Sequence, residues 1–411
     1  MGSDGSDKFT RRTILKTGAG AAIAGPLAQH HAQASSTDEN PSRQSNYVAL
    51  GIRPMINATG NVTVFGGSVM PAEVVAAWID ASKDFVNILD LHNKVGQRIA
   101  GLIGVEAALV TTGAAGAMLL ATAAVVTLPD LSRIPRLPDT RGLRNEVILQ
   151  KSHHSGYDSQ LRAIGTTLID VETVADIDRV VGPNSALMFF MNATDGTITR
   201  ADWIAAARRH QIPTLLDASA DIPPVERLSE YNRMGFDLVA ISGGKAIRGP
   251  NDTGLLLGRK DLIETAKLNT NPYAPTIGRM MKVGKEDMMA LLAAIDRFVT
   301  LDHQAEWHEM ERRITVIEQA LQHVSTVEFE RIVPVTSNHQ PHVIVSWNET
   351  RIKITPQEVT AALAASDPAI LLGRVAGTGS KGILIAVHCL HLGEEKIIAD
   401  RLNAILEKAE S

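Results

Sequence analysis

The chain has 411 residues, 45% of them hydrophobic and 21% charged, with a formal net charge of −5 at pH 7. These values are ordinary for a globular protein with a sizeable core and room for a second domain, and they exclude a chain too polar to fold. The acidic balance disfavours nucleic-acid binding, which depends on neutralising phosphates, so we expect no nucleic acid partner. The single cysteine, Cys389, excludes an intramolecular disulfide.

Residues 1–34 have the form of a twin-arginine signal peptide. Arg11 and Arg12 precede a weakly apolar stretch at residues 18–28, and Ala32-Gln33-Ala34 provides a small-residue cleavage site. Cleavage there would remove four basic and two acidic residues and take the formal net charge from −5 to −7. We therefore expect export to the periplasm without a lasting membrane anchor, the alternative being a basic tail. Residues 35–48 are polar and are expected to form a linker.

From residue 49 to residue 285, short apolar runs alternate with helical patterns. This alternation predicts an α/β domain with a mainly parallel sheet that is covered on both faces. The expected strands are residues 107–110, 146–150, 167–171, 186–191, 214–216, 238–241 and 254–257. The expected helices include residues 116–126, 173–180 and 200–210.

The first candidate binding segment is a run of small residues between a strand and a helix, formed by Gly113, Ala114, Ala115 and Gly116. Small residues let the N–H groups at a helix start close on a phosphate, although a tight-packing turn uses them equally well. The run lacks the GxGxxG spacing of a dinucleotide site, which disfavours that cofactor.

Two histidines follow the expected strand at residues 146–150. His153 or His154 could cover a cofactor ring or handle a proton, because an imidazole titrates near neutral pH. A pair of structural histidines is the alternative.

Asp217 ends the apolar run at residues 212–216. Ligands of open α/β folds bind at the carboxyl edge of the sheet, where this side chain is expected to lie. It could keep a bound pyridine nitrogen protonated, whereas an isolated Asp in such a place is as often a helix N-cap.

Lys245 follows a strand and two glycines in Ser242-Gly243-Gly244-Lys245. A free lysine has a pKa of about 10.4, so a catalytic lysine must be desolvated or lie near positive charge. The glycines are expected to leave room for a planar ring. A phosphate-binding P-loop is excluded, because it requires Gly at Val239 and Ser or Thr at Ala246. The remaining alternative, a surface turn, is disfavoured by the presence of Asp217, and the pair predicts a Schiff-base lysine and an acid for pyridoxal 5'-phosphate.

Cationic residues further along the chain are candidates for binding an anionic substrate. Arg279 and Lys282 lie close together in sequence, and Arg374 precedes a glycine-rich loop. A solvated basic face is the alternative for the first two. His308 and Glu309 begin a sequence similar to a zinc-protease helix, but Arg312 stands in place of the second histidine, so we predict no metal site.

Apolar residues at helical spacing predict a long helix that begins near Glu286 and leads into a smaller C-terminal domain at residues 286–411. Strands are expected there at residues 327–332, 342–347 and 383–387, with helices at 356–365 and 394–408. This mixture predicts a small α+β domain.

Several of these segments together resemble a known family. They are residues 56–60, 112–117, 217–219, 242–250 and 281–286, and they resemble the selenocysteine synthase-like family of fold-type I pyridoxal phosphate enzymes, with the glucosaminate-6-phosphate ammonia-lyase branch closest. The resemblance implies an aspartate aminotransferase-like fold and a homodimer or larger ring with sites between subunits. It places Lys245 at the Schiff-base position and Asp217 at the pyridine nitrogen, assigns residues 113–116 and Ser242 to the cofactor, and lets Thr253 reach the phosphate of a neighbouring subunit's cofactor.

The function that the resemblance implies is a lyase for an amino acid or an amino sugar acid. The substrate amine would displace Lys245, the freed lysine would remove the α proton to give a carbanion, and loss of a β substituent would release ammonia and a keto acid. An aminotransferase or racemase uses the same residues and stays open, as does a non-catalytic cofactor-binding protein. A selenium transferase-like role on tRNA is disfavoured by the acidic charge and by the signal and linker in place of that branch's RNA-binding domain.

Overall fold

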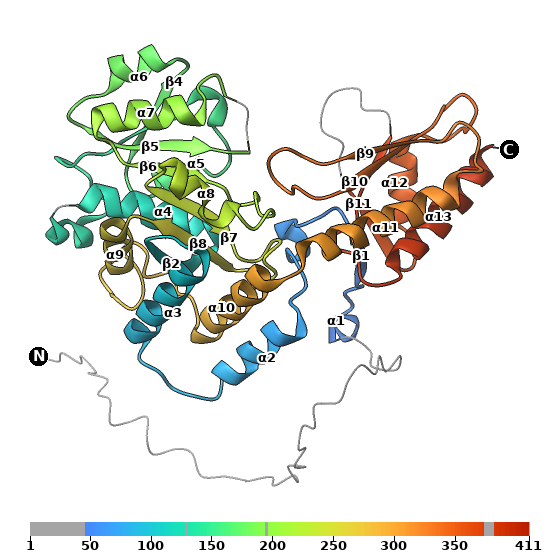
Figure 1. The fold of residues 1–411 in the computed structure, drawn as a ribbon, viewed down its shortest axis with the longest axis horizontal. Helices are drawn as coiled ribbons and strands as arrows, with labels where there is room; N and C mark the ends of the chain where they lie inside the picture. Colours follow the sequence, from blue (N-terminus) through green and yellow to red (C-terminus); the bar gives the residue numbers. More distant parts are fainter. Residues whose placement is uncertain (1–45, 129, 194–195, 374–381, 411) are drawn as a thin grey trace, which may run out of the picture. The chain divides into compact units, whose positions relative to one another are not determined.

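The computed structural model describes residues 46–128, 130–193, 196–373 and 382–410. The chain divides into two compact units, Met1–Ile52 and Arg53–Ser411. The described part of the first unit contains the short helix α1 (Asn46–Ala49). The expected signal peptide and most of the expected linker lie outside the described residues, so their boundaries stay predictions. The elements below belong to the second unit (Figure 1).

A seven-stranded sheet with the order β2-β8-β7-β6-β5-β3-β4 forms the centre of the larger part of this unit. Strands β3 to β7 pair in parallel, and β8 runs antiparallel to both of its neighbours, β2 and β7. The expected mainly parallel sheet is therefore confirmed. The strands are β2 (Ala107–Thr112), β3 (Glu146–Gln150), β4 (Thr167–Val171), β5 (Ser185–Met191), β6 (Thr214–Asp217), β7 (Leu238–Ser242) and β8 (Thr253–Gly258).

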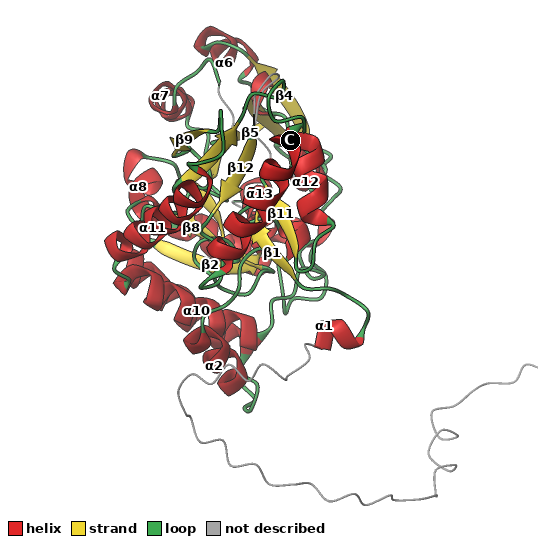
Figure 2. Ribbon diagram, turned by 90° about the vertical axis from the view of Figure 1, so that its right-hand side faces the viewer, coloured by secondary structure: helices red, strands yellow, loops and turns green. Residues whose placement is uncertain are grey.

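Helices cover both faces of this sheet, and Figure 2 labels several of those on one face. Every residue of β5 is buried, and its side chains alternate between two apolar cores, with Met188 and Phe190 in one and Leu187 and Phe189 in the other. A strand buried on both faces explains why this run is continuously apolar. The first core contains residues of α3 (Ile88–Ile103), α7 (Arg200–His210), α8 (Arg227–Met234) and α10 (Lys285–Thr300). The second contains residues of α4 (Gly113–Thr127), α5 (Asp158–Arg162) and α9 (Lys260–Leu268).

The C-terminal part has a separate core and two small sheets. An antiparallel sheet has the order β12-β10-β9, with β9 (Glu328–Ile332), β10 (His342–Ser346) and β12 (Ile383–Ala386). Helices α11 (His303–Leu321), α12 (Pro356–Ala364) and α13 (Glu394–Glu410) contribute side chains to this third core. The helix expected near Glu286 is α10, which starts one residue earlier and is followed by α11.

The first strand of the unit pairs with this C-terminal part. β1 (Met55–Ala58) is parallel to β11 (Ala369–Leu372), and Ile56 and Ala58 lie in the third core. Residues expected at the start of the large domain thus pack with the C-terminal residues. The split of the chain at 285/286 stays a prediction, because Arg53–Ser411 forms one unit.

The remaining described elements connect or flank these layers: α2 (Ala72–Ala81), α6 (Val174–Val180), and the 3₁₀ turns η1 (Thr63–Phe65), η2 (Leu131–Arg136) and η3 (Lys151–His153). Among the described helices, none combines the length and hydrophobicity needed to cross a bilayer.

Candidate active site

The candidate side chains meet because several strands end at one edge of the large sheet. β5, β6 and β7 are parallel and end there, and the two antiparallel pairings of β8 bring the end of β2 to the same edge. The register pairs Thr112 with Thr253 and Ser242 with Gly254. The start of α4, the loop after β7 and Asp217 are therefore neighbours at the edge where open α/β sheets bind ligands.

Lys245 lies in the loop between β7 and β8. A turn closes around it, in which the Arg248 N–H donates to the Lys245 carbonyl at 2.9 Å. The side chain is partly buried, and burial lowers its pKa, while the carboxylates of Asp217 and Asp221 oppose that shift. An amine with a lowered pKa is more often unprotonated, so it is a better nucleophile and base.

The two glycines before Lys245 serve packing within the chain. A Cβ on Gly243 would lie 2.4 Å from the Thr253 Oγ1, and one on Gly244 would lie 2.4 Å from the Asn251 Cα. The space next to the Gly243 backbone is filled by Thr253 of β8 and Leu291 of α10, and the space next to Gly244 is filled by Asn251 of the loop. The expectation that these glycines leave room for a planar ring is therefore corrected: they let the loop fold tightly and present Lys245.

Asp217 is 3% exposed at the end of β6. Burial raises its pKa, and the Ser219 N–H, which donates to Oδ1 at 2.9 Å, and the charge of Lys245 oppose the rise. The amine and the carboxylate thus lie within electrostatic range of each other. A buried carboxylate is stabilised by a cationic partner, and a protonated pyridine nitrogen is such a partner.

The small-residue segment forms the first turn of α4 rather than a loop before it. The helix begins at Gly113, whose φ of 65° favours glycine, and no described side chain caps it. A Cβ on Gly254 would lie 2.2 Å from the Gly113 carbonyl carbon, so β8 packs directly against the helix start. A helix start without a cap has N–H groups free for an anion, which fits a phosphate.

His153 is fully buried and contacts residues at the ends of β3 and β5. The Met191 N–H donates to its Nδ1 at 3.2 Å, the Gln150 side-chain nitrogen lies 3.3 Å from its Nε2, and the ring packs edge-on against Phe190. Burial lowers the pKa of His153 to about 4, so the ring is neutral at neutral pH.

His154 lies between two carboxylates. Its ring nitrogens contact Asp158 at 2.5 Å and Asp170 at 2.7 Å, and the hydrogen bond with Asp158 leads the causes that raise its pKa. Both of its nitrogens are engaged within the protein. A cofactor-contacting role for His153 or His154 stays a prediction.

Ser242 of β7 pairs with Gly254 of β8, and Thr253 of β8 pairs with Thr112 of β2. The Ser242 N–H donates to the Ser219 carbonyl at 3.3 Å, which joins the ends of β6 and β7. The Thr253 side chain is fully buried, and its hydroxyl donates to the Pro250 carbonyl at 2.6 Å. Both residues shape the loop that carries Lys245, and their direct contact with a cofactor stays a prediction.

The sequence reasoning did not identify Asp221. Its carboxylate is 1% exposed, accepts from Asn192 and from the Tyr231 hydroxyl at 3.0 Å, and accepts from the Ser337 N–H at 3.3 Å. It therefore joins the sheet edge to the loop before β10. A second Asp four residues after Asp217 was the signal available in the sequence.

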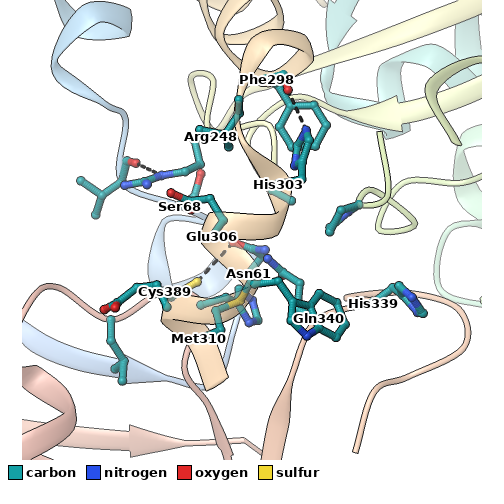
Figure 3. Close-up of a pocket in the computed structure, with 18 of the residues that line it drawn as sticks. Asn61, Ser68, Arg248, Phe298, His303, Glu306, Met310, His339, Gln340 and Cys389 are labelled. Atoms are coloured by element: carbon teal, nitrogen blue, oxygen red, sulfur yellow. Dashed lines mark hydrogen bonds between the residues drawn. The ribbon is translucent and has the colours of Figure 1, made fainter. Parts of the chain in front are cut away.

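A pocket of about 290 Å³ lies beside the Lys245 loop (Figure 3). Ala246 and Arg248 line it from that loop, and the remainder is lined by residues of α10, α11 and the C-terminal part together with Asn61, Ser68, Val69, Pro223 and Pro224. Arg279 and Lys282 are exposed and are not among its lining residues, and Arg374 lies outside the described residues. Within the described part of the chain, the pocket draws its cations from Arg248, Arg297 and Arg313 instead.

Comparison with known proteins adds family information to this geometry. Residues 160–366 match the model of the class-V aminotransferases. A D-glucosaminate-6-phosphate ammonia lyase from Salmonella typhimurium is 26% identical over 377 residues, which cover 88% of this chain and 98% of the relative. A 5'-C-glycyluridine monooxygenase-decarboxylase from a Streptomyces species is 30% identical over 289 residues, covering 67% of this chain and 70% of the relative.

A third relative and a solved structure agree with this placement. An L-seryl-tRNA(Sec) selenium transferase from Desulfovibrio desulfuricans is 27% identical over 58% of this chain and 55% of its own length. The solved structure of a D-glucosaminate-6-phosphate ammonia-lyase has a TM-score of 0.77 and 24% identity, and the match covers 90% of this chain and all of that chain. At that identity the structural likeness shows the fold.

Proposed function

Because this chain belongs to the class-V aminotransferase family, we propose that it is a pyridoxal phosphate-dependent ammonia-lyase that acts on an amino sugar acid. The observation that carries the proposal is the partly buried Lys245 amine within electrostatic range of buried Asp217, beside the uncapped start of α4. The similarity to a D-glucosaminate-6-phosphate ammonia lyase over almost all of that relative's length supports the choice of reaction and substrate class. The resemblance to selenocysteine synthase-like enzymes is confirmed by the same comparison and by the selenium transferase match.

The residues at the sheet edge fit the cofactor of this family. The free N–H groups at the start of α4 would hold its phosphate, Asp217 would hold a proton on its ring nitrogen, and Lys245 would bond to its aldehyde carbon. When bound, pyridoxal 5'-phosphate supplies a ring that takes up electrons from a substrate carbon that has lost its proton.

The chain's own groups then account for the proton transfers. Lys245 Nζ, with its pKa lowered by burial, can accept the proton from the substrate Cα and return it at a later step. Asp217 keeps its negative charge while a cation lies against it, although burial without such a partner raises its pKa. Lys245 can therefore move a proton, while Asp217 holds one in place.

The test of this proposal uses the visible absorbance of the purified protein and its release of ammonia. In the wild type we expect a cofactor absorbance band that borohydride abolishes. In Lys245→Ala we expect no such response to borohydride, and a turnover reduced to about 10⁻² to 10⁻⁴ of the wild-type value. Ammonia should form from an amino sugar acid without an added keto acid. A strict requirement for a keto acid would instead identify an aminotransferase, and a colourless wild-type protein would refute the cofactor assignment.

We propose that the protein works as a homodimer or a larger homo-oligomer. Large apolar side chains that are at least half exposed concentrate early in the second unit, and include Val64, Ile79, Phe85 and Val86. Exposed apolar side chains that gather on one surface are typical of an interface with another protein, and we propose that these side chains form such a surface. A second copy of the chain is the partner expected for this family.

We also propose that residues 1–34 direct export by the twin-arginine route to the periplasm. The support is the sequence pattern around Arg11 and Arg12. Cell fractionation should find the wild type in the periplasm and an Arg11→Lys/Arg12→Lys double variant in the cytoplasm. Equal distribution of the two proteins would contradict the proposal.

A further inference from the structure

We propose that the pocket beside the Lys245 loop binds the polyhydroxylated, anionic end of the substrate, with Arg248 receiving the negative charge and with His388 and Gln340 bonding to hydroxyl groups. The inference rests on the proposed function, because it assigns a binding site to the part of an amino sugar acid that does not react. Figure 3 shows walls of the pocket that come from the Lys245 loop, the segment with Asn61 and Ser68, α10, α11 and the C-terminal part.

Arg248 carries a charge that no described group neutralises directly. Its Nε donates to the Val69 carbonyl at 2.9 Å, and within the described residues its two terminal nitrogens have no hydrogen-bond partner. Burial lowers its pKa and the nearby Arg297 lowers it further, while the charges of Glu306, Cys389 and Glu73 oppose that shift without a direct hydrogen bond to Arg248. An incompletely paired, partly desolvated guanidinium is costly, and an anion in the pocket would relieve that cost.

The backbone of Arg248 supports a functional role. Its φ is 61°, in the left-handed region that residues other than glycine seldom adopt. The turn with Lys245 holds it there, since the Arg248 N–H donates to the Lys245 carbonyl. The same loop therefore positions the reactive amine and an arginine three residues later, and such strain is found at sites where geometry serves binding.

The other two arginines of the pocket are paired within the protein. Arg297 contacts Glu73 at 2.8 Å, and Arg313 contacts Glu309 at 2.9 Å and donates to two backbone carbonyls. The described lining therefore offers one arginine, Arg248, for an added anion. This favours a ligand with a single anionic group at this end.

Three polar atoms in the walls of the same pocket have no partner in the described structure. They are both ring nitrogens of His388 and Oε1 of Gln340, and all three are shielded from solvent. Burial lowers the pKa of His388 to about 3, so its ring is neutral, with one nitrogen as donor and the other as acceptor. A hydroxyl group both donates and accepts, whereas an apolar ligand would leave these atoms unsatisfied.

The experiment measures binding by calorimetry to the holoprotein, with ligands that lack an amine and so do not react at Lys245. D-gluconate carries a carboxylate and hydroxyls, D-glucitol 6-phosphate a phosphate and hydroxyls, D-glucitol hydroxyls alone, and hexanoate a carboxylate alone. We expect one of the first two to bind at least about 10-fold more tightly than glucitol and hexanoate. The tighter of the two identifies the anion that the pocket receives. Equal binding of all four ligands would overturn the inference.

Variants locate the binding in this pocket. We expect Arg248→Gln to weaken binding of the preferred ligand by about 10- to 100-fold and Gln340→Leu by about 3- to 10-fold, with Arg248→Lys intermediate. The exposed residues Arg351 and Gln357 provide matched controls, and Arg351→Gln and Gln357→Leu should bind like the wild type. Unchanged binding in Arg248→Gln would overturn the inference.

The cofactor chromophore separates this inference from the proposed function. Every variant should retain the borohydride-sensitive band, which shows that the protein is folded and loaded. If the wild-type protein is coloured but substitution of Arg248 leaves ligand binding unchanged, the inference is refuted and the proposed function is not. A colourless wild-type protein refutes the proposed function.

Discussion

Asp217 is a buried carboxyl group whose ionisation depends on the charge that lies against it. We expect Asp217→Asn to weaken cofactor binding by about 10- to 100-fold, because a charge-assisted hydrogen bond is lost. The cofactor dissociation constant, measured from the absorbance band, checks this. Wild-type affinity in the variant would show that Asp217 does not contact the cofactor.

The same substitution makes a prediction for the cofactor-free protein. Burial raises the pKa of Asp217 above its unfolded value, so the folded state holds a proton that the unfolded state releases as the pH rises. The contribution of Asp217 to stability is therefore lost as the pH rises from the unfolded pKa through the folded pKa. Denaturant melts should show Asp217→Asn gaining on the wild type as pH rises from 4 to 8, and the reverse trend would contradict this assignment.

His154 offers a pH dependence of the same sign as that of Asp217, because its folded pKa is also raised. Its carboxylate partners Asp158 and Asp170 raise its pKa, so its contribution to stability is complete below the unfolded pKa and is lost as the pH rises through the folded pKa. Because the side chain is 33% exposed, we expect His154→Gln to cost about 0.5–1 kcal/mol at pH 5 and less at pH 9. Urea melts at both pH values measure the difference, and a pH-independent loss would indicate packing alone.

The sequence predicted those residues whose chemical role shows in the neighbouring sequence. It did not predict residues whose role depends on partners far away in the sequence. Lys245 and Asp217 stand out because each is a charged group at the end of an apolar run. Asp221 does not stand out, because its role is visible only when Asn192 and Ser337 lie beside it. The sequence predicted that Gly243 and Gly244 leave room for a planar ring, but in the structure their neighbours are Thr253 and Asn251, so the missing side chains make room for these residues instead.

At the level of elements, several segments with a clear apolar pattern were predicted well. The limits of β3, β4 and α7 agree with the expected ranges 146–150, 167–171 and 200–210. β1 was missed because a strand of four residues carries little periodic signal and its partner, β11, lies near the other end of the chain. α4 begins three residues before its expected start, because its first turn consists of small residues that resemble a loop.

The contact between β8 and the start of α4 gives a prediction at this scale. Gly254→Ala would place a methyl group 2.2 Å from the Gly113 carbonyl carbon, so backbone must move. We expect a loss of about 1–3 kcal/mol in the free energy of unfolding, together with weaker cofactor binding. Thermal and denaturant melts with a cofactor titration measure both effects.

A helical glycine of the same unit is the control. A Cβ on Gly101 of α3 would have no atom within 4 Å, so Gly101→Ala should stabilise by about 0.5–1 kcal/mol and leave cofactor affinity unchanged. If Gly254→Ala behaved like Gly101→Ala, the close packing at the helix start would be disproved.

For the whole molecule, the exposed apolar side chains near the start of the second unit predict assembly. We expect Val64→Asp and Phe85→Asp to shift the protein towards monomers by light scattering at micromolar concentration, because a buried carboxylate in an interface is costly. The exposed Tyr157, elsewhere on the chain, provides the control Tyr157→Asp, which should assemble like the wild type. Monomeric wild-type protein would contradict the proposal.

The pairing of β1 with β11 has a consequence for how the protein is made. β1 leaves the ribosome long before its partner strand exists, so the core that contains Ile56 and Ile370 stays open until nearly all of the chain has been translated. A nascent chain stopped before β11 would keep those side chains in water and would lack one wall of the pocket. This core of the protein therefore forms only when synthesis of the chain is nearly complete.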